Sequence, residues 1–289
     1  EAALRALDKA MSDFRSGVFD VLVTAPMNKS TISTQGIYFK GHVDYIATCL
    51  GEGQKTLPLL VSERLRMAFA TQDVALKDVP HAIGKDSLAQ QLIQLGQTLC
   101  RDFSISAPRI AVLSLNPAVD DEGLFGTEEQ EYIVPAIAEA ETKKIQAFGP
   151  YAADSFFGEH LYEQFDAVLA MYHDQGMTPF KAMRHEYGVI EMAGLPVVAV
   201  SPLQGADYDE AGKGVADESD FRNALYLALD VYRNRKMYDE PLGHPLKKLY
   251  KERRDESEKV RFSVPKKHGG VTMGTHRAEA PNDHTAGKE

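Results

Sequence analysis

A five-residue apolar run, residues 167–171, stops abruptly at residues 172–176, which read YHDQG. A short and wholly apolar run is typical of a strand buried on both faces, the usual pattern of parallel sheets in α/β proteins. In open α/β sheets, ligands bind outside the carboxyl ends of the strands. The sequence therefore predicts a functional site at this strand end. There His173 can bind a metal or move a proton, Asp174 can orient it, and Lys181 can meet an anion.

Strand-like and helix-like segments alternate along the rest of the chain. Apolar strand-like runs cover residues 18–24, 57–61, 66–71, 109–115, 165–171 and 196–201, and helical spacing recurs over residues 1–14, 87–103, 128–140 and 220–234. Leu225, Leu229 and Tyr232 are expected on the buried face of the last helix. Pro135 is expected to bend the helix over 128–140 or to mark a boundary in it. The alternation predicts an α/β fold with a largely parallel sheet.

Length and composition limit the classes of function. A chain of 289 residues, 44% hydrophobic and 26% charged, can bury a full core and has an ordinary globular composition. A formal net charge of -10 argues against broad nucleic-acid binding, and an anionic ligand would need a local cationic pocket. No run is long enough to span a bilayer and no signal-peptide layout is present, so a cytoplasmic protein is expected. Cys49 and Cys100 are too few for a disulfide framework.

Several short motifs follow one another in a fixed order between residues 21 and 235. They are TAPMNK at 24–29, GHVD at 41–44, LNP at 115–117, GTEE at 126–129, GP at 149–150, AMYHDQG at 170–176, AGLP at 193–196 and AGKG at 211–214. In this order they resemble the PdxA family, the 4-hydroxythreonine-4-phosphate dehydrogenases of pyridoxal phosphate synthesis. Several ordered motifs are far more specific than any one, so the chain is identified by resemblance as a member of this family.

The resemblance implies two α/β/α lobes around a central cleft, as in isocitrate and isopropylmalate dehydrogenases. Residues 1–50 and 150–250 are expected to form the first lobe and residues 51–149 the second. Residues 265–289 are polar and are expected to be disordered. The family has an N-terminal segment with a Gly-Pro-rich motif, and this chain begins beyond it, so an incomplete first lobe is expected. The family also implies a homodimer.

The resemblance further implies NAD-dependent oxidation and decarboxylation of 4-phosphohydroxy-L-threonine, a small phosphorylated hydroxy acid. A divalent metal (Zn, Mg or Mn) would polarise the hydroxyl. In the family, three histidines shared between subunits hold the metal. One position matches His173, the second matches Asp73, which can supply an oxygen, and the third matches Ala118, which cannot bind a metal. Metal binding is therefore expected to be weak or lost, and a purely hydrogen-bonded His173 is an equal alternative.

His42 and Lys181 match substrate-binding positions of the family, but other polar positions are replaced. Val43 stands in place of a threonine, Ile190 in place of an asparagine and Ala199 in place of an arginine. Glycines and prolines that shape the backbone are kept. This combination is the pattern expected of a non-catalytic or repurposed homologue.

Two functions stay open. The first is a PdxA-type NAD-dependent oxidoreductase of pyridoxine biosynthesis with a degraded active site and weak or absent turnover. The second is a non-catalytic homologue that folds, dimerises and binds a small anion or an active paralogue. Stoichiometric binding of a divalent metal separates them, because an enzyme of this mechanism needs the ion.

Overall fold

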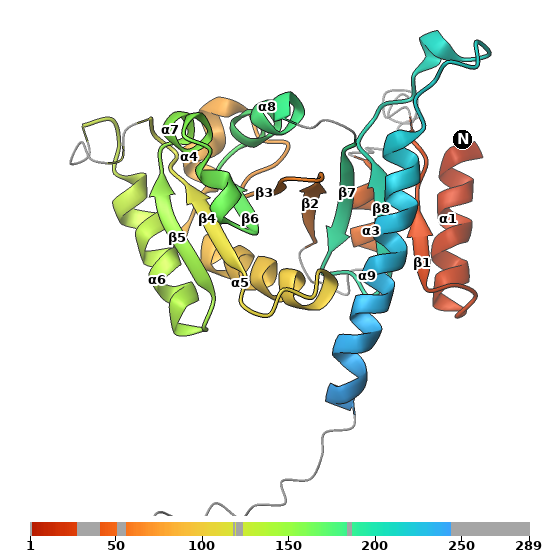
Figure 1. Cartoon of the computed structure of the whole chain (residues 1–289), viewed down its shortest axis with the longest axis horizontal. Coiled ribbons are helices and arrows are strands. Elements are labelled where there is room, and N and C mark those ends of the chain that lie inside the picture. The colour runs from red at the N-terminus through yellow and green to blue at the C-terminus, as the bar shows by residue number, and fades with distance from the viewer. Residues whose placement is uncertain are drawn as a thin grey trace, which may run out of the picture. The chain divides into compact units, whose positions relative to one another are not determined.

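The described part of the chain is built around one eight-stranded sheet. The computed structural model describes residues 2–27, 41–50, 56–117, 119, 124–183 and 187–243, all within one compact unit. The strand order is β1-β8-β7-β2-β3-β6-β4-β5 (Figure 1). The strands are β1 (Val21–Val23), β2 (Leu57–Val61), β3 (Arg66–Phe69), β4 (Arg109–Leu113), β5 (Gln146–Tyr151), β6 (Ala167–Ala170), β7 (Val189–Ala193) and β8 (Val198–Pro202).

Helices cover both faces of this sheet (Figure 1). They are α1 (Ala2–Arg15), α3 (His42–Leu50), α4 (Val79–Ala82), α5 (Lys85–Asp102), α6 (Val134–Thr142), α7 (Ala153–Gly158), α8 (His173–Met183) and α9 (Ser219–Gly243). Short 3₁₀ turns η1 (Leu76–Asp78), η3 (Leu161–Gln164) and η4 (Tyr208–Glu210) and a π-helical turn η2 (Glu129–Ile133) complete the elements. The predicted α/β class is therefore confirmed.

The sheet is mixed rather than largely parallel. β1–β8, β3–β6, β6–β4 and β4–β5 pair in parallel, whereas β8–β7, β7–β2 and β2–β3 pair antiparallel. The antiparallel block arises because β2 and β3 are joined by only four residues, too few for the crossover that a parallel pair needs. The parallel block keeps the carboxyl ends of β3, β6 and β4 at one edge.

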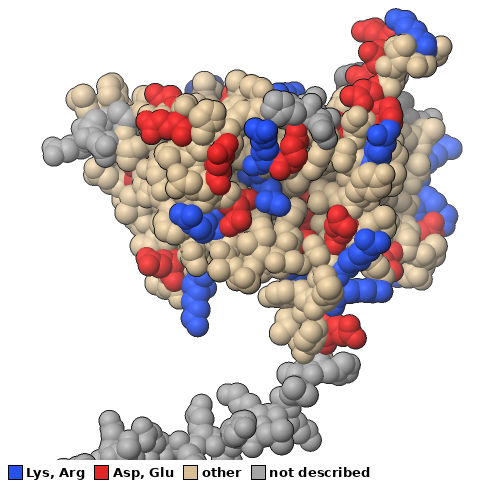
Figure 2. Space-filling view, in the orientation of Figure 1, with Lys and Arg blue, Asp and Glu red and all other residues tan. Residues whose placement is uncertain are grey.

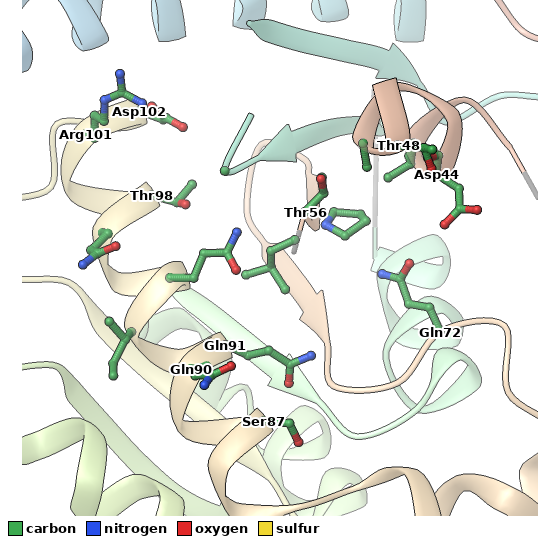
Figure 3. A pocket seen from close by; sticks show the side chains of 18 residues that line it. Asp44, Thr48, Thr56, Gln72, Ser87, Gln90, Gln91, Thr98, Arg101 and Asp102 are labelled. Carbon is green, nitrogen blue, oxygen red and sulfur yellow. The ribbon is translucent and has the colours of Figure 1, made fainter. Parts of the chain in front are cut away.

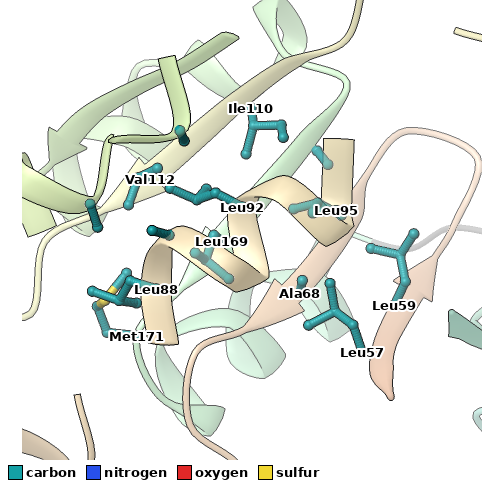
Figure 4. Close-up of a cluster of buried hydrophobic side chains, with 14 of the residues drawn as sticks. Leu57, Leu59, Ala68, Leu88, Leu92, Leu95, Ile110, Val112, Leu169 and Met171 are labelled. Atoms are coloured by element: carbon teal, nitrogen blue, oxygen red, sulfur yellow. The ribbon is translucent and has the colours of Figure 1, made fainter. Parts of the chain in front are cut away.

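The main hydrophobic core lies between α5 and the sheet. Leu88, Leu92, Leu95 and Leu99 repeat every three or four residues and are all buried. Figure 4 shows three of these leucines lying against side chains of β2, β3, β4 and β6. The predicted helix over residues 87–103 and its apolar face are confirmed.

The predicted buried face of α9 is wrong, whereas the predicted boundary at Pro135 is confirmed. Leu225 and Leu229, expected inside, are 43% and 48% exposed. The buried side chains of α9 include Ala224 and Ala228, because small residues let a helix approach a sheet closely. Pro135 marks a boundary as predicted: the π-helical turn ends at Ile133 and α6 begins at the next residue.

The predicted division into lobes stays a prediction. Strand β6 comes from residues 150–250, yet it lies in the sheet between β3 and β4, which come from residues 51–149. The predicted disordered tail, residues 265–289, lies outside the described residues. Acidic and basic side chains are interspersed over the face drawn in Figure 2. No described helix is long and apolar enough to cross a membrane.

Candidate active site

The parallel pair β3–β6 brings two predicted site segments together. Phe69 pairs with Ala170, and the pairing continues past the strands, where the Ala70 and Thr71 amides donate to the carbonyl oxygens of Ala170 and Met171. The Thr71 hydroxyl also donates to the Met171 oxygen at 2.7 Å. The segments that follow each strand, with Asp73 and His173, therefore leave the same edge of the sheet.

A cavity of about 370 Å³ lies at this edge, and we call it the strand-end cavity. His42 and Asp44 line it from the start of α3, Gln72 and Asp73 from the segment after β3, and His173 from the start of α8. Three of the predicted site residues, His42, Asp73 and His173, thus share one cavity. Its size suits a small metabolite, because ligand pockets usually begin at about 300 Å³.

Asp174 lies within hydrogen-bond distance of His173. The Nδ1 atom of His173 lies 2.8 Å from Asp174 Oδ1, and the ring stacks on Phe69 with centroids 6.0 Å apart. A carboxylate acceptor at Nδ1 fixes the proton there, which leaves Nε2 as the lone-pair nitrogen of the neutral ring. His173 can therefore accept a proton or bind a metal through Nε2. Its side chain is 58% exposed, so solvent reaches the pair.

Asp73 has an unusual backbone. Its φ is 51°, in the left-handed region that few residues other than glycine adopt. Aspartate tolerates this region better than most because its short side chain can bond locally. The conformation places a carboxylate rather than a bulkier side chain at the lining of the strand-end cavity.

The donors that the structure describes are too few for a resident metal ion. Among the described residues, no group of three or more histidine, cysteine, aspartate or glutamate side chains is arranged to hold one. Asp73 and His173 line the same cavity, but two donors fall short of the three or four protein ligands of a stable site. Ala118, which matches the third family position, lies outside the described residues.

The strand-end cavity also lacks a cation in its described lining. Its charged lining residues are Asp44 and Asp73, and no described lining residue is a lysine or arginine. Lys181 is exposed near the C-terminal end of α8 and does not line the cavity. The structure therefore brings together three of the predicted residues but not the predicted anion-binding lysine.

Gln175 and Gly176, the rest of the motif, support the backbone. Gln175 Oε1 accepts from the Met171 amide at 2.7 Å, and its Nε2 donates to the Ser114 carbonyl at 2.6 Å. This side chain ties the ends of β6 and β4 together. A Cβ on Gly176 would lie 2.6 Å from Phe69 Cε1 and closer still to Met67 Sδ, so only glycine lets α8 pack this near β3.

Glu129 has a role that the sequence did not reveal. Its Oε1 accepts from the amides of Leu115 and Asn116, both at 2.8 Å, and its Oε2 accepts from Asn116 Nδ2 at 2.9 Å. The Asn116 amide also donates to Glu128, which holds the pKa of that carboxyl below its usual range. Together the two glutamates fix the loop after β4.

The replaced family positions differ in their surroundings. Val43 and Ile190 line the strand-end cavity, whereas Ala199 is buried in the apolar cluster beneath α1 and α3. Sequence reasoning assigned no role to Asp44, the last residue of the GHVD motif, or to Gln72, which directly precedes Asp73.

A larger hollow of about 1010 Å³ lies between α3 and α5, and we call it the α3–α5 groove. Glutamines and hydroxyl side chains dominate its lining, with Arg101 and Asp102 at one end (Figure 3). It shares Val43, Asp44, Pro58 and Gln72 with the strand-end cavity, so the two hollows adjoin.

Comparison with known proteins relates the chain to one family. The family model described as pyridoxal phosphate biosynthetic protein PdxA matches residues 1–228. The 4-hydroxythreonine-4-phosphate dehydrogenase of Bacteroides thetaiotaomicron is 49% identical over 264 residues, which are 91% of this chain and 72% of that protein.

Solved structures of the same family have the same fold as this chain. A 4-hydroxythreonine-4-phosphate dehydrogenase from Burkholderia phymatum superposes with a TM-score of 0.63 at 32% identity, over 78% of this chain and 68% of that one. A terephthalate 1,2-cis-dihydrodiol dehydrogenase from Burkholderia xenovorans has a TM-score of 0.60 at 23% identity, over 79% of this chain and 72% of that one. The second likeness concerns the fold alone, which carries different substrates in the two enzymes.

Proposed function

Because this chain belongs to the PdxA family, we propose that it is an NAD-dependent dehydrogenase by descent whose active site is degraded. Its inherited substrate is 4-phosphohydroxy-L-threonine or a close phosphorylated hydroxy acid, and its inherited pathway is pyridoxal phosphate biosynthesis. One observation carries the proposal: His42, Asp73 and His173 line one cavity at the carboxyl ends of the strands. Dehydrogenase turnover is weak or absent.

The roles of the inherited residues follow from their positions. His173, oriented by Asp174, is the group that would take the hydroxyl proton, and His42 would hydrogen-bond the substrate. Lys181 does not line the described cavity, so it would bind the phosphate only if it reached the site from elsewhere, for example from a second subunit. A divalent metal would supply charge stabilisation at the oxidised oxygen, but the described donors do not amount to a site for it.

NADH formation tests the proposal. Purified full-length chain is mixed with NAD and 4-phosphohydroxy-L-threonine, with and without Zn²⁺, Mg²⁺ or Mn²⁺. We expect a rate far below the ordinary enzymatic value of about 1 s⁻¹, and a further drop in His173→Ala. A rate of about 1 s⁻¹ or more would show that the site is intact and that the degraded-site proposal is wrong.

A non-catalytic role is the second candidate, favoured by one observation. Val43 and Ile190, which replace polar family residues, both line the strand-end cavity, so its lining has become more apolar. In this role the chain is a cytoplasmic homodimer that retains a small anionic ligand or binds an active paralogue. Thermal unfolding with the substrate, compared with the NADH assay, separates the cases: a protein that the substrate stabilises but that forms no NADH when NAD is supplied supports binding without turnover.

A further inference from the structure

A buried group of charged side chains joins α5 to α9. Arg235 on α9 donates from Nε and Nη2 to the two carboxylate oxygens of Asp102, at 2.7 and 2.9 Å. Its Nη1 donates to the carbonyl oxygens of Leu195 and Val197, at 3.1 and 3.2 Å. Asp102 is 2% exposed and Arg235 is 5% exposed. Most donors of the guanidinium are therefore already engaged with these four acceptors.

Glu191 on β7 lies beside this pair. It is fully buried, and among the described residues no N–H group donates to either of its carboxyl oxygens. Arg235 Nη2 is 3.8 Å from Glu191 Oε1, too far for a hydrogen bond. Its partners across the sheet are Leu59 on β2 and Val200 on β8, which carry no polar side chain. An ionised carboxylate here would lose its water and gain no donor.

Three charged groups face Glu191. Asp102 on α5 adds negative charge, while Arg235 on α9 and Arg66 on β3 add positive charge. Arg66 is partly engaged: its Nη1 donates to the Asp166 carbonyl at 3.3 Å and its guanidinium lies over the Phe103 ring, whereas its buried Nε has no hydrogen-bond partner among the described residues. Burial raises the pKa of Glu191 well above its usual range and Asp102 raises it further, whereas the two arginines lower it.

We propose that Glu191 keeps its proton in the folded chain and donates a hydrogen bond to Asp102. The two carboxyl groups and Arg235 then form one proton-dependent cluster, which we call the lock, joining α5, β7 and α9. Two ionised carboxylates can only accept, so a bond between these side chains requires a proton on one of them. Asp102 already accepts from Arg235, which favours its ionised form and leaves the proton on Glu191. The lock is independent of the proposed enzymatic function.

The proton gives the stability of the fold a defined dependence on pH. In the unfolded chain Glu191 ionises near the ordinary glutamate value of about 4.3. Above that pH the folded chain binds one more proton than the unfolded chain, so stability falls as the pH rises, until Glu191 ionises in the folded state too. Within this window the contribution of Glu191 raises the unfolding equilibrium constant by up to about tenfold per pH unit.

Urea unfolding of the full-length chain between about pH 5 and about pH 9 tests the lock, with Glu191→Gln and Glu159→Gln compared with the wild type. Glutamine has the shape of the protonated acid and an amide that can donate to Asp102. We expect the ratio of the wild-type to the Glu191→Gln unfolding constant to grow by up to about tenfold per pH unit. Glu159, which is exposed, should leave the wild-type profile unchanged. Parallel profiles for the wild type and Glu191→Gln would overturn the proposal.

A second measurement does not depend on the variant folding. Wild-type protein labelled with ¹³C at the glutamate carboxyl is followed by NMR at about pH 7, where ordinary glutamates are ionised. The lock predicts one resonance at the shift of a protonated carboxyl. If every glutamate resonance has the shift of an ionised carboxylate, Glu191 is charged in the folded state and the lock does not exist.

Discussion

Glu129 and Gln175 fix backbone, whereas His173 and Asp73 face the strand-end cavity, although Gln175 and His173 belong to one motif. Glu129 and Gln175 each make short hydrogen bonds that tie separate segments of backbone together. His173 and Asp73 line a cavity, and His173 is more than half exposed. Side chains of one motif can therefore have two different tasks, since Gln175 fixes backbone while His173 faces a cavity.

The sharpest way to break this comparison is to remove Glu129. Glu129→Ala leaves the amides of Leu115 and Asn116 and the Asn116 side chain without their acceptor, and we expect a loss of about 3 kcal/mol or more in the free energy of unfolding. Urea denaturation measures it. Glu131→Ala is the control, because Glu131 is exposed and accepts only from Thr127. If both variants lose the same free energy of unfolding, Glu129 does not have the proposed structural role.

Filling the space at Gly176 should have the next largest effect. Gly176→Ala pushes a methyl group against Met67, Phe69 and Ala170, and overpacking of this kind costs about 1–3 kcal/mol. Gly158→Ala is the matched control in α7, since nothing lies within 4 Å of its added methyl group. A thermal unfolding scan compares the two. If Gly176→Ala is as stable as Gly158→Ala, close approach of α8 does not explain this glycine.

Removing the Gln175 side chain should cost less. Gln175→Ala loses one bond to the Met171 amide and one to the Ser114 carbonyl, and we expect about 1–2 kcal/mol. Hydrogen exchange of the Met171 amide reports the loss locally, because that N–H would no longer have its acceptor. Unchanged protection at Met171 would contradict the assignment.

The smallest effect is expected at the cavity. His173→Ala removes a mostly exposed side chain bonded only to its neighbour Asp174 and stacked on Phe69, so we expect a stability change of about 0.5 kcal/mol or less. Urea denaturation of His173→Ala and Gln175→Ala compares the losses in the free energy of unfolding. A loss at His173 as large as that at Gln175 would remove the distinction between the two regions.

Local patterns in the sequence predicted much of this architecture. The leucine spacing of α5 gave its buried face, and the apolar run before His173 located the strand end, because both patterns arise from neighbours in sequence. Contacts between residues that are far apart in the sequence could not be predicted, because they leave no local pattern. Glu129 binds backbone 13 and 14 residues away, and Glu191 lies in an apolar strand whose charged partners come from α5, α9 and β3.

The orientation of α9 shows why amphipathic patterns can mislead. Leu225 and Leu229 carry the larger apolar surface, yet the helix turns Ala224 and Ala228 toward the sheet. Close approach over β8 and the buried bonds of Arg235 fix this orientation. Polar contacts made deep in the fold can therefore override a stripe of leucines.

Titration calorimetry with zinc, together with elemental analysis of the purified protein, tests whether the chain holds a metal ion. We expect no stoichiometric zinc and no difference between the wild type and His173→Ala, because Asp73 and His173 are too few donors for a stable site. One tightly bound zinc per chain, lost in His173→Ala, would contradict this expectation and would show that the family's metal chemistry is retained.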